Sequence, residues 1–394
     1  MALAELLQGV LPIPTVSYRE QGVLNFVRRF AEERGLECEA DAFGNVAVRY
    51  QSGRSRKGRE RRPLVLQAHT DHPGFVVSVV RGKRLELEFR GGLSAEYGVG
   101  EPLRVYGEGL PEPGAKARVT SVMASKAGPR GVGMARRIVG ARAVLEGTGD
   151  IGGVAGGTVH VGDLALWDVE ACRIRGELVH ARQCDDLAGC VAVLATLDRV
   201  SAAGGDGDLI GLFTRAEEVG LEGAAAAAGS GTLPADALVV AIETSSSAGG
   251  RAEQGGGGII RVGDRGHIFS PRMTRWMTTL AEELVAESSE RTRGFRYQRK
   301  LMDAGTTEAT AFDLLGYETG AACLALGNWH NAGPKGRVRA ETVHLGDLEN
   351  LVRLCEAMVA GVPRFQSVVD GATKRWREIA KAVGPRLREA SPRS

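Results

Sequence analysis

Four short apolar runs, each followed by a polar side chain, dominate the hydrophobic pattern of this chain. Runs of this length without polar alternation are typical of strands that are buried on both faces and covered by helices. Helical spacing between them predicts helices over residues 187–200, 271–288 and 345–362. We therefore predict an α/β fold with a central, mostly parallel sheet sandwiched by helices. The runs and the residues that follow them are Leu64–Ala68 before His69, Leu209–Phe213 before Glu217 and Glu218, Ala237–Ile242 before Glu243, and Ala321–Leu326 before His330.

The remaining regions differ in pattern. Apolar residues from Val23 to Ala31 recur at helical spacing, and Ser17 with Glu20 predicts a capping box at the start of that helix. Residues 73–172 contain short alternating runs such as Arg84–Arg90 and no long helical pattern, which predicts a small all-β domain. We expect this domain to be inserted in a catalytic domain formed by residues 1–72 and 173–362. Residues 363–394 form a basic tail.

Composition narrows the functional classes. The 394 residues carry 50 basic and 48 acidic side chains, a formal net charge of +2, which gives no reason to expect nucleic acid or an anionic membrane as partner. No apolar run is long enough to span a bilayer, and the first residues lack the basic segment of a secretion signal. The six cysteines form no C-x-x-C pair. We expect a cytoplasmic protein with reduced thiols.

The polar residues at the strand ends indicate a metal site. Parallel strands end at one edge of a sheet, where α/β proteins bind ligands, and Asp185-Asp186 stands just before the predicted helix at 187. Two histidines with several carboxylates suit zinc, cobalt or manganese better than calcium or magnesium. The carboxylates exceed what one zinc needs, which indicates two metal ions. Asp71 is placed to orient His69, and the adjacent Glu217 and Glu218 suggest a general base beside a metal ligand.

Each of these elements has an ordinary explanation when taken alone. Asp185 could cap a helix, Glu217 and Glu218 could lie on a solvated turn, and His330 could be a core or surface histidine. Glu243 is harder to explain in this way, because an unpaired buried carboxylate is costly. The prediction rests on the joint order and placement of the set.

Several segments resemble the dinuclear-metal aminopeptidases that include glutamyl aminopeptidase and the tetrahedral aminopeptidases, also called cellulase-M or endoglucanase-like proteins. The resemblance extends from near the N-terminus to about residue 362. It implies an aminopeptidase with two zinc ions, or cobalt or manganese, that removes N-terminal residues from short peptides. The matching segments are LQAHTDHPGFVV (66–77), ARQCDDLAG (181–189), FTRAEEVGLEG (213–223), AIET (241–244), DRGHIFSP (264–271), GTTEATA (305–311) and WHN (329–331).

The resemblance also implies a role for each residue. His69 and Glu243 would bind one metal, Glu218 and His330 the other, and Asp185 would bridge both ions. Glu217 would be the general base, and Asp71 would orient His69. The inserted β domain would mediate dimerisation, and such dimers often assemble into twelve-subunit particles.

The chain departs from the family pattern at four positions. Glu243 stands where the family has aspartate, His72 where it usually has glutamate, Leu187 where arginine is common and Thr307 where aspartate is usual. Because no ligand is lost, we expect an active enzyme. The alternatives are an N-acyl-amino-acid deacylase or a carboxypeptidase on a related dinuclear site, and a degenerate member that binds metal or peptide without catalysis. The deacylases and carboxypeptidases usually carry their lid domain later in the chain than Glu243.

Overall fold

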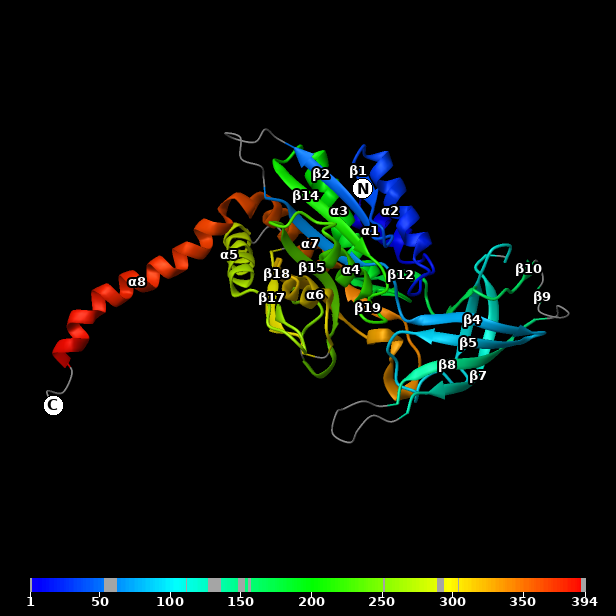
Figure 1. Cartoon of the computed structure of the whole chain (residues 1–394). Coiled ribbons are helices and arrows are strands. Elements are labelled where there is room, and N and C mark those ends of the chain that lie inside the picture. The colour runs from blue at the N-terminus through cyan, green and yellow to red at the C-terminus, as the bar shows by residue number, and fades with distance from the viewer. Residues whose placement is uncertain are drawn as a thin grey trace.

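The computed structural model describes residues 2–52, 62–110, 112–126, 136–147, 153–154, 157–250, 252–288, 294–303 and 305–390. Three parts are visible in Figure 1: a helix-covered sheet, a β-barrel beside it and a long C-terminal helix that extends away from the sheet. Within the described ranges, no helix is both long and apolar enough to cross a bilayer.

The central sheet has eight strands among the described residues, and it is mixed rather than uniformly parallel. Its middle strands β14, β3, β15 and β18 are parallel, whereas β1, β2 and β16 each pair antiparallel with at least one neighbour. The middle strands are almost entirely buried, as predicted for strands covered on both faces. In spatial order the strands are β1 (Glu37–Ala40), β2 (Val46–Ser52), β14 (Gly207–Thr214), β3 (Leu64–His69), β15 (Leu238–Ser246), β18 (Glu318–Leu326), β16 (Gly258–Gly263) and β17 (Tyr297–Leu301).

Helices cover both faces of this sheet. Alternate side chains of β3 point to opposite faces, so Leu64 and Leu66 join one hydrophobic cluster and Val65 joins another. The first cluster includes residues of α1 (Leu3–Val10), α2 (Gln21–Glu33), α3 (Leu187–Ala202), α5 (Pro271–Glu287) and α7 (Leu345–Gly361). The second includes residues of α4 (Glu222–Ser230) and α6 (Glu308–Leu314). The helices predicted from the pattern are α2, α3, α5 and α7, while α1, α4 and α6 were not predicted.

A closed six-stranded antiparallel barrel lies between β3 and α3 in the chain. Its alternating strands point apolar side chains inward, and Phe75 packs edge-on against Phe89 and Trp167, with ring centroids 4.8 and 5.1 Å apart. The barrel confirms the expectation of a small all-β unit. In spatial order its strands are β11 (Leu164–Trp167), β4 (Gly74–Arg81), β5 (Arg84–Arg90), β8 (Ile138–Leu145), β7 (Ala115–Ala124) and β6 (Pro102–Tyr106).

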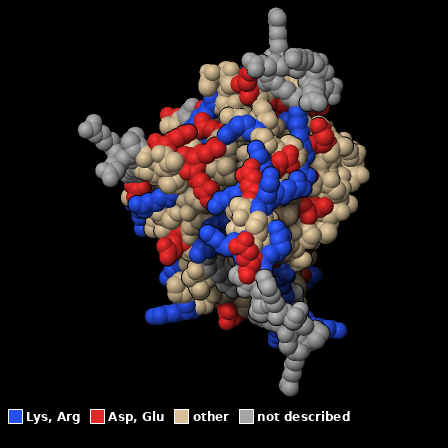
Figure 2. Space-filling view, turned by 90° about the vertical axis from the view of Figure 1, so that its left-hand side faces the viewer, with Lys and Arg blue, Asp and Glu red and all other residues tan. Residues whose placement is uncertain are grey.

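The smaller elements complete the described structure. β12 (Cys172–Arg175), β13 (Leu178–Ala181) and β19 (Glu341–His344) form a three-stranded sheet, and β9 (Gly153–Val154) pairs with β10 (Gly157–Thr158). Helix α8 (Phe365–Ala390) packs its first turn on α5 through Phe365 and Trp276. On the face shown in Figure 2, basic and acidic side chains are interspersed, so the overall charge balance also holds locally on this face.

Candidate dinuclear metal centre

The predicted site residues converge at the carboxyl edge of the central sheet. His69 ends β3, Glu243 lies near the end of β15, and Glu217 and Glu218 follow β14. Asp185 stands two residues before α3, and His330 lies in a short 3-10 turn after β18. All six line one cleft of about 840 Å³ between the sheet and the barrel.

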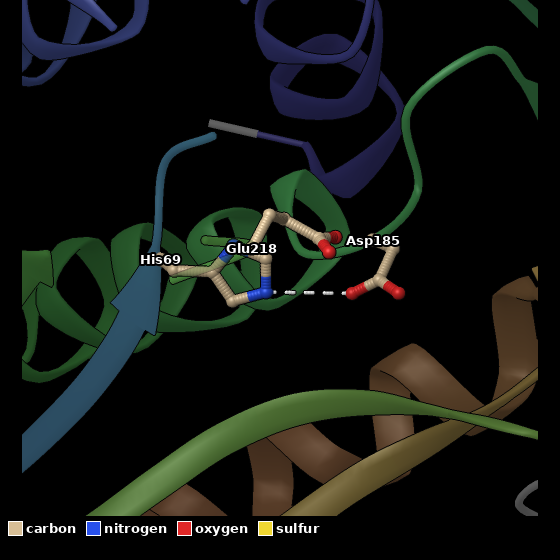
Figure 3. A group of neighbouring side chains, drawn as sticks. All are labelled: His69, Asp185 and Glu218. Carbon is tan, nitrogen blue, oxygen red and sulfur yellow. Dashed lines mark ion pairs between the residues drawn. The ribbon is translucent and has the colours of Figure 1, made fainter. Parts of the chain in front are cut away.

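Asp185 occupies the centre of this group. Its Oδ1 lies 3.4 Å from His69 Nε2, and its Oδ2 lies 3.5 Å from His330 Nε2. Glu243 Oε1 is 3.5 Å from His69 Nε2, and Glu218 Oε1 is 3.3 Å from His330 Nε2. Figure 3 shows the carboxylates of Asp185 and Glu218 on the imidazole side of His69. The arrangement is two histidine–carboxylate groups that share Asp185.

The contacts of the other ring nitrogens define the tautomers. His69 Nδ1 lies 3.1 Å from the carbonyl oxygen of Asp71, and His330 Nδ1 lies 2.5 Å from that of Gly92. A carbonyl oxygen can only accept, so each Nδ1–H donates. Each Nε2 is therefore the ring nitrogen left to bind a cation beside the carboxylates, which is the arrangement a metal-binding histidine needs.

The electrostatics of the group indicate missing positive charge. Burial alone would lower the pKa of His69, but Glu217 and Asp185 raise it well above its ordinary value, and Glu218 and Asp185 do the same for His330. Burial raises the pKa of Glu217 well above its ordinary range, and the neighbouring Glu218 raises it further. Burial would also raise the pKa of Asp185, yet the two histidines lower it.

The donor set fits two divalent cations. Ligand atoms of His69, Asp185 and Glu218 lie within 4.8 Å of one another, and so do those of His69, Asp186 and Glu243. Among the described residues, the buried atoms Glu218 Oε1 and Asp186 Oδ2 have no hydrogen-bond partner. Buried acceptors without donors are costly unless a cation satisfies them. Nitrogen with carboxylate oxygen is the ligand chemistry of zinc, cobalt and manganese.

Comparisons with known proteins agree with this site. The family model for M42 glutamyl aminopeptidase matches residues 44–354. The chain belongs to the M42 glutamyl aminopeptidase family. The predicted family, α/β fold and metallopeptidase class are thereby confirmed. Aminopeptidase activity is thus favoured over a deacylase or carboxypeptidase.

Individual relatives of this M42 member cover nearly its whole length. An Acetivibrio thermocellus protein, provisionally named an aminopeptidase, is 25% identical over 365 residues, which are 89% of this chain and 96% of the relative. The TET1 peptidase of Pyrococcus horikoshii is 23% identical with a TM-score of 0.67, over 91% of this chain and 99% of that one. The aminopeptidase APDkam598 of Desulfurococcus kamchatkensis is 22% identical with a TM-score of 0.69, over 93% and 97%. These two structures support the fold.

Asp71 links His69 to the segment that carries Glu217 and Glu218. Its carboxylate accepts the backbone N–H groups of Glu217 at 3.0 Å and Glu218 at 3.2 Å, and the hydroxyl of Ser17 at 2.6 Å. Its Oδ1 lies 3.5 Å from His69 Nδ1, so its own carbonyl oxygen, at 3.1 Å, is the nearer partner of that imidazole. Asp71 thus contacts both His69 and the two glutamates.

The predicted capping box at Ser17 and Glu20 was wrong. The helix begins at Gln21, and Glu20 precedes it without a side-chain cap bond. The Ser17 hydroxyl donates to Asp71 instead, and the Glu20 carboxylate accepts the N–H of Ala216 and pairs with Arg215. Partners distant in the chain, an acceptor for Ser17 and donors for Glu20, bind these side chains instead of the local backbone, because the fold brings them close.

Sequence reasoning missed Glu341, which supports both halves of the M42 site. This residue begins β19 and is fully buried. Its Oε2 accepts the N–H groups of Cys184 at 2.8 Å and Asp185 at 3.0 Å, and its Oε1 accepts that of His330 at 2.8 Å. Burial and the nearby Asp185 raise its pKa. No local sequence signal marks this role, because two of the three N–H groups lie 157 and 156 residues away in the chain.

The structure shows what three of the residues that depart from the family pattern contact. The Thr307 hydroxyl donates to Glu243 Oε2 at 3.0 Å, so the threonine contacts the ligand candidate whose side chain is one methylene longer than the family's usual aspartate. His72 is buried, with Nδ1 2.6 Å from the Asp185 carbonyl oxygen and Nε2 3.2 Å from Asn331 Oδ1. Burial lowers the pKa of His72 to about 4. Leu187 packs in the sheet core.

Proposed function

We propose that this M42 member removes N-terminal residues from short peptides with two divalent metal ions per subunit, zinc in the first place and cobalt or manganese as alternatives. His69 and Glu243 would hold one ion, His330 and Glu218 the other, and Asp185 both. The observation that carries the proposal is the position of Asp185, whose two oxygens each face one histidine Nε2. Single-metal sites do not need a carboxylate placed in this way.

When bound, the two ions would lower the pKa of a shared water and stabilise negative charge on the scissile carbonyl oxygen. Glu217 would act as general base. It lines the cleft, its Oε2 lies 4.0 Å from His69 Nε2, and its backbone N–H is bound to Asp71. Its carboxylate would take the proton of the attacking water and pass it to the leaving amine.

Assembly and location follow as further parts of the proposal. The TET1 peptidase of P. horikoshii can assemble into a tetrahedron or an octahedral shell. We extend homo-oligomerisation to this chain, as a dimer or a larger particle up to a dodecamer, with residues 73–172 as the dimerisation domain. All six cysteines are free, which suits the reducing cytoplasm.

The test is an assay of the purified protein on a panel of aminoacyl-p-nitroanilides, before and after chelation and after addition of zinc, cobalt or manganese. We expect activity to vanish with chelator and return with metal. Glu217→Gln should lose about 100-fold or more in kcat while binding metal as the wild type does. Absence of cleavage with every substrate and metal would refute the proposal.

A further inference from the structure

Arg137 lies on the barrel side of the cleft, and its backbone is held by hydrogen bonds to a neighbouring segment. It precedes β8, whose first residue Ile138 is buried in the barrel core. The Arg137 carbonyl oxygen accepts the N–H of Ser125 at 2.8 Å, its own N–H donates to the Ser125 hydroxyl at 3.1 Å, and it forms a β-bridge with Ser94. Because side chains alternate along a strand, Arg137 points away from the barrel core, and it lines the cleft.

Gly92 brings this side chain next to a metal-ligand candidate. A Cβ atom at Gly92 would lie 3.8 Å from the His330 ring and 3.9 Å from Arg137 Nη1. The same glycine accepts the His330 Nδ1–H through its carbonyl oxygen. The guanidinium and the imidazole therefore border one small space that a larger residue at position 92 would fill.

The Arg137 guanidinium has no acidic partner among the described residues. Two other arginines of the cleft are engaged: Arg90 pairs with Glu88 at 3.1 Å, and Arg261 is buried and donates to Ser245 at 2.9 Å. Arg265 also lines the cleft and is exposed, but Arg137 is the one that Gly92 brings beside His330. A cation that is exposed, fixed at its backbone and beside a metal ligand is placed to bind an anionic group of a substrate. Arginine binds carboxylates through two parallel hydrogen bonds, which gives direction as well as charge.

We propose that Arg137 binds a substrate carboxylate that lies within one residue of the scissile bond; this rests on the aminopeptidase function proposed above. Consecutive Cα atoms are about 3.8 Å apart, so two carboxylates lie within roughly 7 Å of the scissile carbonyl. One is the C-terminal carboxylate of a dipeptide, and the other is the side chain of an acidic N-terminal residue. Both groups are carboxylates, so Arg137 would bind either of them in the same way. Substrates that carry only one of the two carboxylates distinguish them.

The experiment compares metal-loaded wild type, Arg137→Gln, Arg137→Lys and the control Arg142→Gln on Leu-Gly, Leu-Gly-amide and Glu-Gly-amide, by release of the free amino acid. Arg142 is exposed on the same strand and does not line the cleft, so its variant makes the same charge change elsewhere. We expect Arg137→Gln to lose about 10-fold in kcat/KM, mainly through KM, on one carboxylate-bearing substrate and less than about 2-fold on Leu-Gly-amide. Arg137→Lys should retain part of the preference.

The pattern of losses identifies the source of the carboxylate. A loss confined to Leu-Gly assigns Arg137 to the peptide C-terminus, and a loss confined to Glu-Gly-amide assigns it to the N-terminal side chain. Equal effects of Arg137→Gln on all three substrates, or effects matched by Arg142→Gln, would overturn the inference about Arg137. Cleavage of Leu-Gly-amide by the wild type would still support the aminopeptidase function. If the wild type cleaves none of the three, both proposals fall.

Discussion

The two walls of the cleft are built differently. The sheet wall carries metal-ligand candidates that are almost fully buried, with exposures of 1% for His69, 4% for Asp185 and 6% for Glu243, and neighbouring groups hold them in place. The barrel wall presents exposed charges such as Arg137, and the Gly92 carbonyl oxygen on this wall accepts the Nδ1–H of His330. From this comparison we predict that metal binding and substrate choice can be changed separately in this chain. The sheet wall should control the first and the barrel wall the second.

The largest expected effect is on the free energy of unfolding, and it concerns Glu308 on the sheet side of the molecule. Glu308 is buried, accepts from the Thr214 hydroxyl at 2.7 Å, and has a pKa raised to about 8 by burial. Well below pH 4.5 the carboxyl is neutral in both the folded and unfolded states. As pH rises from there to 8, only the unfolded state ionises, so the folded state loses stability. Glu308→Gln should therefore be more stable than the wild type by about 3 kcal/mol at pH 7 and equal to it at pH 4.

Denaturant unfolding of the metal-free protein at several pH values measures this difference. Glu88→Gln on the barrel wall, where the side chain is 54% exposed, serves as the control and should change stability by less than about 0.5 kcal/mol. A stability gap for Glu308→Gln that does not widen between pH 4 and 8 would contradict the burial argument.

The second prediction concerns Glu341, whose carboxylate accepts backbone N–H groups beside both predicted metal positions. Glu341→Gln would turn an NH₂ group toward one or more of the three backbone N–H groups that the carboxylate accepts. Replacing such supporting groups typically costs 10–100-fold in metal affinity, and we expect a loss of about this size by chelator competition. Glu222→Gln makes the same change at the cleft rim, where the carboxylate binds the Tyr18 hydroxyl, and should leave metal affinity unchanged. Equal affinities for all three proteins would remove Glu341 from the site.

The smallest effect tests the contact between Thr307 and Glu243. Thr307→Val keeps the shape but removes the hydroxyl that donates to Glu243 Oε2. We expect about a 3–10-fold weaker affinity for one of the two metal equivalents, because the lost hydrogen bond is to a charged group. Thr307→Ser should restore the affinity, and Thr306→Val, at the neighbouring cleft residue, should not alter it. If Thr307→Ser fails to restore binding, the threonine acts through packing instead.

Part of this picture was predictable from the chain alone. Buried strands leave long apolar runs, and the residue that follows each run must lie at the carboxyl edge of the sheet; His69, Glu217, Glu218, Glu243 and His330 all lie at this edge. The alternating pattern of β5 and β7 likewise indicated the β-rich unit that forms the barrel. These inferences succeed because periodicity and strand ends are local properties.

Tertiary structure decided which groups support the site. Glu341 lies 156 residues from Asp185 along the chain, Ser17 lies 54 from Asp71, and Arg137 comes from the barrel. No local pattern distinguishes a buried acid that accepts distant backbone N–H groups from one in a surface strand. The sequence by itself determined the residue types and their strand ends. The fold alone decided their partners, because hydrogen bonds and ion pairs form by proximity in space, whatever the separation in the chain.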